Sequence, residues 1–239
     1  MAAKMLPLLF FLTILQSALS LSVRARAGDH AHFGSVTRIM ALVNPGRVEA
    51  YDYKSHFPDI QFIPVTGLDA TAFLDTEQMM ADETYLPMSE EMKAQWRASP
   101  YVEDNLIHNR SLGQLACALG HYKMWMQAAS MSPGEWAIML EDDAKPQTTS
   151  AQLTTYMSRI PTDIHLVMLG NRQCYGRAGA EAYAVTADGA KYLMSRRFRN
   201  ADHMLGLVPG TKRLCAQPSD GGFFFIHAPT ENAGTSMKN

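Results

Sequence analysis

Hydrophobic residues occur along the chain in two kinds of segment, whose lengths distinguish strands from helices. Short, almost wholly apolar runs predict buried strands, and they lie at residues 36–43, 60–65, 136–140, 164–169, 182–186 and 223–226. Asn44-Pro45-Gly46 ends the first run with a strong turn signal. Pro64 lies near the end of the second run and has no backbone N–H, which predicts an edge of the sheet or an exit from it.

Longer segments between these runs show the spacing of helices. The clearest begins at Ser111, which forms a capping box with Gln114, and predicts a helix over residues 112–129. A short helix is predicted over residues 89–97, with acids at its start and a base at its end, and another over 188–197. Strands that alternate with helices predict an α/β sandwich with a mostly parallel sheet, in which ligands bind beyond the carboxyl ends of the strands.

The N-terminus has the three parts of a secretory signal peptide. Lys4 supplies a positive charge, residues 6–15 are apolar, and small residues follow up to Ala27. An uncleaved membrane anchor is the alternative, because the apolar region can be extended to Val23. Both interpretations place the rest of the chain in the lumen of the endoplasmic reticulum or Golgi, or outside the cell, where Asn109-Arg110-Ser111 is a glycosylation sequon.

Composition and charge exclude several classes of protein. The 239 residues are 47% hydrophobic and 18% charged, with a net charge of -2. Near-neutrality argues against a dedicated nucleic-acid binder, and the ordinary apolar fraction argues against disorder. We divide the chain into a leader over residues 1–27 and one domain over residues 28–239, whose size fits a single large domain.

The chain has three cysteines, too few for a small disulfide-stapled scaffold. Cys117 lies among apolar residues and is interpreted as a small buried hydrophobe. Cys174 and Cys215 are candidates for a disulfide in an oxidising lumen.

Glu141-Asp142-Asp143 follows the apolar run at residues 136–140 directly. Three adjacent carboxylates at a partly desolvated edge are costly unless a cation is present. Hard divalent ions such as Mg²⁺ or Mn²⁺ prefer oxygen ligands and keep open positions for substrate phosphates. A solvated loop or a helix N-terminus is the alternative interpretation of the three acids.

Two ordered blocks of the sequence resemble glycosyltransferase family 25. The first runs from Leu112-Gly113-Gln114 through Cys117 and His121, and continues at Ala137-Ile138-Met139-Leu140-Glu141-Asp142-Asp143-Ala144. The family pattern there is an Ala-Cys-x-x-Ser-His helix and an apolar strand ending in Glu-Asp-Asp; Gly120 replaces the serine. The second block covers residues 181–193, and Asp202 falls where that block places an acid.

The family includes bacterial lipooligosaccharide galactosyltransferases and animal procollagen galactosyltransferases. The resemblance implies a single-domain, Rossmann-like type A glycosyltransferase fold and inverting transfer of a hexose from a UDP-sugar. Asp143, assisted by Asp142 or Glu141, would hold Mn²⁺ or Mg²⁺ against the departing diphosphate. Asp202 is the first choice for the general base that takes the proton of the acceptor hydroxyl; a structural acid is the alternative.

Other polar residues at the expected edge are further candidates for the site. His121 could orient the acidic cluster through a ring N–H or be a satisfied core histidine. His227 follows the last apolar run, where a third metal ligand could arrive. Asn171 and Arg172 follow the run at 164–169, and Arg172 could pair with phosphate, whereas Tyr183 lines the sugar pocket or packs in the core.

Three hypotheses therefore compete. The first is a galactosyltransferase or related hexosyltransferase in the secretory pathway, with a nucleotide-sugar donor and a hydroxyl of a glycan or protein as acceptor. The second is a metal-dependent phosphoester hydrolase, for which clustered acids and histidines are also suitable. The third is a secreted sugar-nucleotide-binding protein of the same fold without activity.

Overall fold

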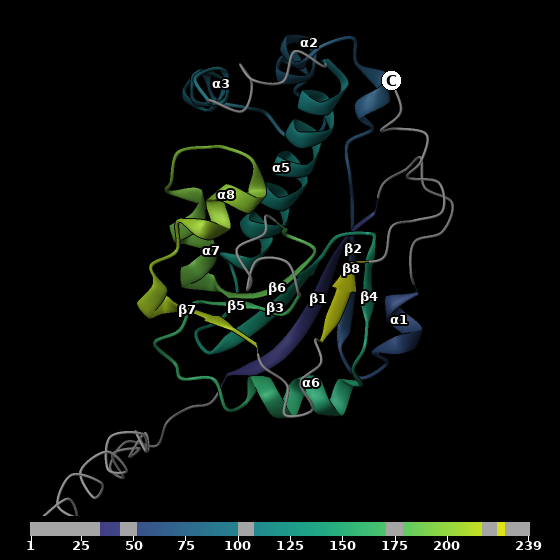
Figure 1. The fold of residues 1–239 in the computed structure, drawn as a ribbon, viewed down its shortest axis with the longest axis vertical. Coiled ribbons are helices and arrows are strands. Elements are labelled where there is room, and N and C mark those ends of the chain that lie inside the picture. Colours follow the sequence, from purple (N-terminus) through teal and green to yellow (C-terminus); the bar gives the residue numbers. More distant parts are fainter. Residues whose placement is uncertain (1–33, 44–51, 100–107, 171–178, 217–223, 228–239) are drawn as a thin grey trace, which may run out of the picture. The chain divides into compact units, whose positions relative to one another are not determined.

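A six-stranded sheet forms the centre of the computed structural model, with strand order β2-β1-β3-β6-β5-β7 (Figure 1). The structure describes residues 34–43, 52–99, 108–170, 179–216 and 224–227, with only the backbone at 108–111 and 227. The strands are β1 Ser35–Val43, β2 Gln61–Thr66, β3 Glu135–Leu140, β5 Leu166–Met168, β6 Ala182–Thr186 and β7 Arg213–Cys215.

The direction of the strands confirms the predicted class. β1 is parallel to β2 and β3, and β5 is parallel to β7. β6 lies between β3 and β5 and is antiparallel to both. The protein is therefore an α/β protein with a mostly parallel sheet. β2, which contains Pro64, is an edge strand, as the proline predicted.

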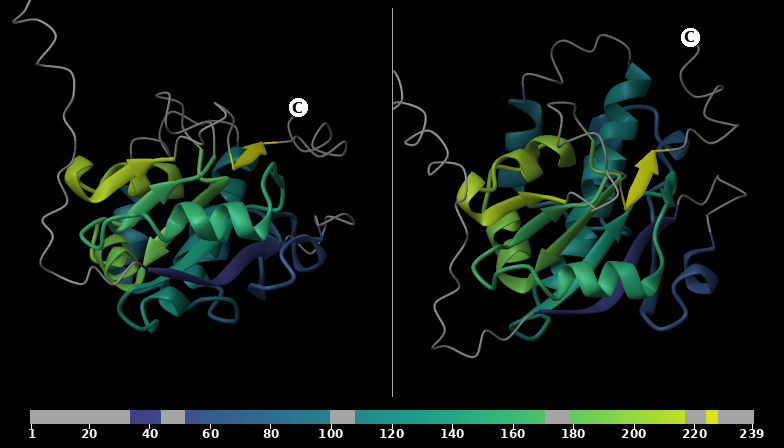
Figure 2. Two further views of the ribbon diagram at one scale, coloured as in Figure 1. Left: turned by 90° about the horizontal axis from the view of Figure 1, so that it is seen from below. Right: turned by 60° about the horizontal axis from the view of Figure 1, so that its bottom comes forward.

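Helices cover both faces of the sheet, as the views in Figures 1 and 2 show. The α-helices are α1 Tyr53–His56, α2 Thr76–Ala81, α3 Glu90–Arg97, α5 His108–Ala128, α6 Ser150–Met157, α7 Ala187–Met194 and α8 Ala201–Gly206. Two short 3₁₀ turns are η1 Ala70–Ala72 and η3 Gly210–Lys212. Within these described ranges, no helix is long and apolar enough to cross a membrane.

Alternate residues of β3 enter two separate cores, as the period of a strand requires. Ala137 and Met139 pack in the core under α5 and α7, with Leu115 and Leu193. Ile138 and Leu140 pack in the other core, under α1 and α6, with Tyr53 and Leu153. Because β3 is buried on both faces, its sequence is continuously apolar rather than alternating.

Several predicted boundaries differ from the structure. Helix α5 begins at His108, so the capping box at Ser111 is wrong and the sequon Asn109-Arg110-Ser111 lies in helical backbone. Helix α7 ends at Met194 because Ser195 caps it, before the predicted residue 197. The last apolar run forms β8 Phe225–His227, which pairs with β4 Ala144–Pro146 outside the main sheet (Figure 1). The predicted leader lies outside the described residues.

Candidate active site

The acidic cluster forms a tight turn at the carboxyl end of β3. The backbone N–H of Ala144 donates to the carbonyl of Glu141 at 3.1 Å, which places Asp142 and Asp143 at the two central positions. Glu141 also donates its N–H to the carbonyl of Glu181 at 3.0 Å, next to the start of β6. The three acidic side chains are half-buried. We call residues 141–144 the acidic turn.

Tyr53 of α1 forms hydrogen bonds with the backbone of the acidic turn. Its hydroxyl group lies 2.6 Å from the carbonyl oxygen of Ala144 and 2.9 Å from that of Glu141. The side chain is 1% exposed and packs in the core between α1 and the sheet. The single hydroxyl proton is shared between the carbonyl groups at the two ends of the turn, which restricts the backbone that carries Asp142 and Asp143.

Helix α5 brings two of its side chains to Glu141. Nε2 of His121 lies 3.1 Å from Oε1 of Glu141, and the Cys117 thiol donates to the same oxygen at 3.5 Å. His121 and Cys117 are four residues apart, so they share one face of the helix. Behind them, the hydroxyl of Tyr183 on β6 lies 2.8 Å from Nδ1 of His121. Tyr183 is fully buried, which fits packing, one of its two predicted roles.

Asp202 joins this neighbourhood from α8. It lies in the first turn of that helix, where its N–H donates to the side chain of the cap residue Asn200. Burial raises the pKa of the Cys117 thiol well above its usual range, and the negative charges of Glu141, Asp202 and Asp143 raise it further. The fold therefore places Asp202 near enough to Cys117, on the face of α5 that meets Glu141, for its charge to act on the thiol.

The backbone of His227 also reaches the acidic turn. His227 pairs with Ala144 in the β4–β8 ladder, next to Asp143 in the chain. Its side chain, together with Asn171, Arg172 and Cys174, lies outside the described residues. The predicted roles of these residues stay predictions.

A comparison with models of protein families identifies the family of this chain. The model of the family described as glycosyltransferase family 25 (LPS biosynthesis protein) matches residues 58–175 of the 239-residue chain. The chain belongs to glycosyltransferase family 25. A comparison with curated proteins gave no match.

Membership of family 25 makes the chain a glycosyltransferase, with a sugar donor and an acceptor as its partners. The matched residues include all of α5 and all of the acidic turn. Tyr183 and Asp202 lie beyond the matched residues, so their placement near His121 and Cys117 rests on the fold.

The replacement of the family serine by Gly120 has a structural reason. A Cβ atom at residue 120 would lie 2.5 Å from Cδ1 of Leu42 on β1. Helix α5 therefore approaches β1 too closely at this point for any side chain unless Leu42 moves.

Two residues that contact the acidic turn, Tyr53 and Glu181, were not predicted from the sequence. Tyr53 lies in a short helix of four residues with no sequence signal for its contact with the acidic turn. Glu181 is 1% exposed and packs so closely over Gly170 that a Cβ atom there would lie 2.5 Å from its Oε1. An acid directly before a buried strand, like the acids directly after β3, was the available signal for Glu181.

The donor set of the described residues offers two ways to hold a metal ion. The ligand atoms of Cys117, His121 and Glu141 all lie within 4.8 Å of one another. Asp142 and Asp143 are not part of that group, but they supply the oxygen ligands that Mn²⁺ and Mg²⁺ prefer. The carboxylates of the acidic turn thus fit a hard cation by their chemistry, and the inner group has the softer donor set of zinc.

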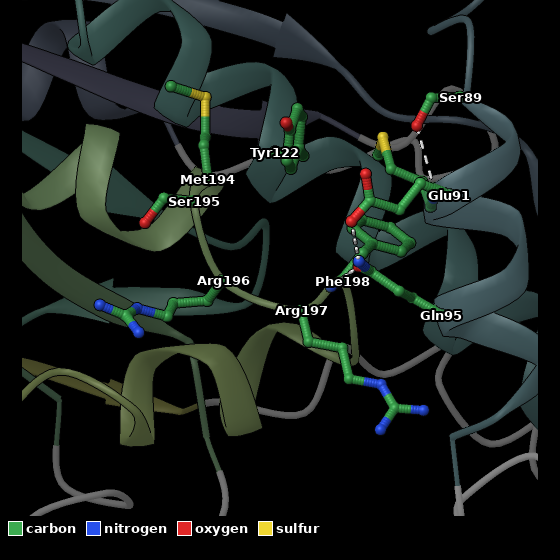
Figure 3. A pocket seen from close by; sticks show the side chains of 10 residues that line it. Ser89, Glu91, Gln95, Tyr122, Met194, Ser195, Arg196, Arg197 and Phe198 are labelled. Atoms are coloured by element: carbon green, nitrogen blue, oxygen red, sulfur yellow. Dashed lines mark hydrogen bonds between the residues drawn. The ribbon is translucent and has the colours of Figure 1, made fainter.

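A separate pocket of about 440 Å³ lies between α3 and the segment that follows α7 (Figure 3). Its walls include Glu91 and Gln95 of α3, Tyr122 of α5, and Arg197 and Phe198. Oε1 of Gln95 accepts the backbone N–H of Phe198 at 2.5 Å and so ties the two walls together. Of the predicted site residues whose side chains the structure describes, none lines this pocket.

Proposed function

We propose that this glycosyltransferase moves a hexose, with galactose as the first candidate, from a UDP-sugar to a hydroxyl group of a glycan or protein. The transfer inverts the anomeric carbon and depends on Mn²⁺ or Mg²⁺. The proposal is supported by the acidic turn, which follows β3 at the carboxyl edge of the sheet, and by Asp202, whose charge acts on the thiol of Cys117 beside Glu141. Ligands of open α/β sheets bind at this edge.

The roles follow from charge. Asp143, with Asp142 or Glu141, would hold the cation, which when bound stabilises the negative charge of the departing diphosphate. Asp202 would take the proton of the acceptor hydroxyl as that oxygen attacks the anomeric carbon. Two separate carboxylate positions suit these two tasks, because one must stay with the cation while the other gains a proton.

We also propose that the chain works in the lumen of the secretory pathway or is secreted. The leader pattern over residues 1–27 and the sequon support this location. Cys215 is disulfide-bonded and Cys117 is a free thiol, a state that suits an oxidising compartment.

A donor screen tests the proposed activity. Purified protein is incubated with UDP-galactose, UDP-glucose and other nucleotide sugars, with Mn²⁺ or with EDTA, and sugar transfer and donor hydrolysis are measured. Asp143→Asn and Asp202→Asn should each lower transfer by about 10²–10⁴-fold. Asp188→Asn is the matched control, because Asp188 lies in the first turn of α7 as Asp202 does in α8, but is exposed.

The outcomes separate the hypotheses. Transfer that requires Mn²⁺ and is lost in both variants, but not in Asp188→Asn, supports the proposal. Release of phosphate from phosphoesters without any sugar transfer would favour the hydrolase. Donor binding without turnover against a broad acceptor panel would favour a protein that only binds sugar nucleotides.

A further inference from the structure

A buried series of hydrogen bonds runs from the core to the acidic turn. The indole N–H of Trp125 donates to the hydroxyl of Tyr183 at 2.8 Å, and that hydroxyl lies 2.8 Å from Nδ1 of His121. Nε2 of His121 then lies 3.1 Å from Oε1 of Glu141. Trp125, Tyr183 and His121 are each 0% exposed, whereas the side chain of Glu141 is 20% exposed.

The donors and acceptors of this series fix where its protons lie. An indole N–H can only donate, so the Tyr183 oxygen accepts from Trp125. The hydroxyl proton of Tyr183 then has Nδ1 of His121 as its acceptor. Nδ1 must therefore be unprotonated, and the ring carries its proton on Nε2, which donates to Glu141. The opposite tautomer would leave a buried hydroxyl proton without an acceptor.

The same reasoning identifies the donors to Oε1 of Glu141. Oε1 receives the Nε2 proton of His121 and the thiol proton of Cys117, both from α5. Both hydrogen bonds from α5 therefore fix the position of this oxygen. A protonated Nε2 cannot coordinate a metal ion, so the close approach of Cys117, His121 and Glu141 is a hydrogen-bonded group.

We propose that the series Trp125–Tyr183–His121–Glu141 holds Glu141 in position, so that the acidic turn is already ordered before the cation and the sugar donor bind. His121 is then a positioning residue that acts through Glu141, and it is not a metal ligand. The inference rests on the proposed function, because it assigns the cation to the acidic turn. Partners of this kind contribute about 10–100-fold to the affinity of a metal site.

The first experiment reads the tautomer in metal-free protein. Nitrogen-15 NMR of the histidine rings should show His121 with its proton on Nε2, its signals being assigned by their loss in His121→Gln. In Tyr183→Phe the donor to Nδ1 is gone, and the ring should change to a mixture of tautomers. Tyr192→Phe is the matched control, since its hydroxyl donates to the carbonyl of Leu207 outside the series. A proton on Nδ1 in the wild type would overturn the inference.

The second experiment measures Mn²⁺ affinity by titration calorimetry. Tyr183→Phe should weaken binding about tenfold, and Tyr192→Phe should leave it unchanged. If Tyr183→Phe does not fold, the pair His121→Gln and His121→Leu replaces it. Glutamine can accept from Tyr183 and donate to Glu141, so it should bind Mn²⁺ within about threefold of the wild type, whereas leucine should lose about tenfold.

Failure of this inference differs from failure of the proposed function. If the wild type binds no Mn²⁺ and transfers no sugar, the proposed function fails whatever the tautomer. If the wild type binds Mn²⁺ and the hydroxyl and histidine variants bind it equally well, the positioning role fails alone. Titration with Co²⁺ adds a direct check, because a thiolate charge-transfer band that is lost in Cys117→Ser would show that the inner group is a metal site after all.

Discussion

The acidic turn and helix α3 both concentrate charged residues, but the fold holds them in different ways. In α3, the Lys93 ammonium lies 2.7 Å from Glu90, and the Arg97 guanidinium lies 2.6 Å from Glu77 of α2. Glu77, Glu90 and Arg97 are exposed. At the acidic turn, the partners of Glu141 are instead core residues, with Tyr53 1% and His121 0% exposed.

This difference shows which charges the fold uses to build a site. Exposed ion pairs are screened by water and contribute about 0–1 kcal/mol each. Partners supplied by the core cannot move without disturbing the packing of two cores. We therefore expect changes around the acidic turn to affect stability and function together, and changes on α3 to affect stability slightly.

The largest effect on stability is expected for Tyr53→Phe. It removes the buried donor of two carbonyl groups and should lower the free energy of unfolding by about 2 kcal/mol. Chemical denaturation measures the loss, and Mn²⁺ affinity should fall in the same variant. Tyr85→Phe is the control, because the Tyr85 hydroxyl donates to the carbonyl of Thr66 at an exposed position. Equal losses in the two variants would contradict the role given to Tyr53.

A smaller effect is expected for Gly120→Ser, which restores the family residue. The new Cβ would displace Leu42, and overpacking of this kind should cost about 1 kcal/mol. Gly113→Ser on the same helix is the control, since a Cβ there meets nothing within 4 Å, and it should stabilise the protein by about 0.3 kcal/mol. If the close approach is the cause, Leu42→Ala should remove most of the cost in a double mutant. Additive losses would contradict it.

The smallest effect is expected for Glu77→Gln. A hydrogen bond from Arg97 lowers the pKa of Glu77 from its usual 4.5, so the pair stabilises the folded state above that pH. This contribution is lost as the pH falls through the lowered pKa. The variant should lose less than about 0.5 kcal/mol at pH 7 and less than this at an acidic pH below the lowered pKa. Glu83→Gln, at an exposed residue, is the control, and an equal loss at both pH values would contradict the assignment.

The sequence predicted the parts of the fold that local patterns determine. β3 and the acidic turn after it follow from five apolar residues and three acids, and α3 follows from the acids at its start and the base at its end. The start of α5 was misplaced because Ser111 and Gln114 imitate a cap inside the helix. β8 was assigned no partner because pairing with β4 depends on residues far away in the chain.

The acids of the candidate site could be predicted from the sequence. The residues that hold these acids in place were harder to predict. Spacing alone places Cys117 and His121 on one face of a helix. It does not reveal that this face meets Glu141, or that Tyr183 stands behind His121, because both contacts join separate elements across the core. Tyr53 is the extreme case, since no pattern connects it with the turn that it holds.

The reversed strand β6 has a consequence for how this protein can change in length. Because β6 runs against its neighbours, it begins beside the ends of β3 and β5, and Glu181 enters next to Glu141 and Gly170. Insertions just before Glu181 would therefore lie at the edge of the sheet that carries the acidic turn. Insertions after Met194 would instead separate Phe198 from Gln95 of α3, which its backbone N–H bonds.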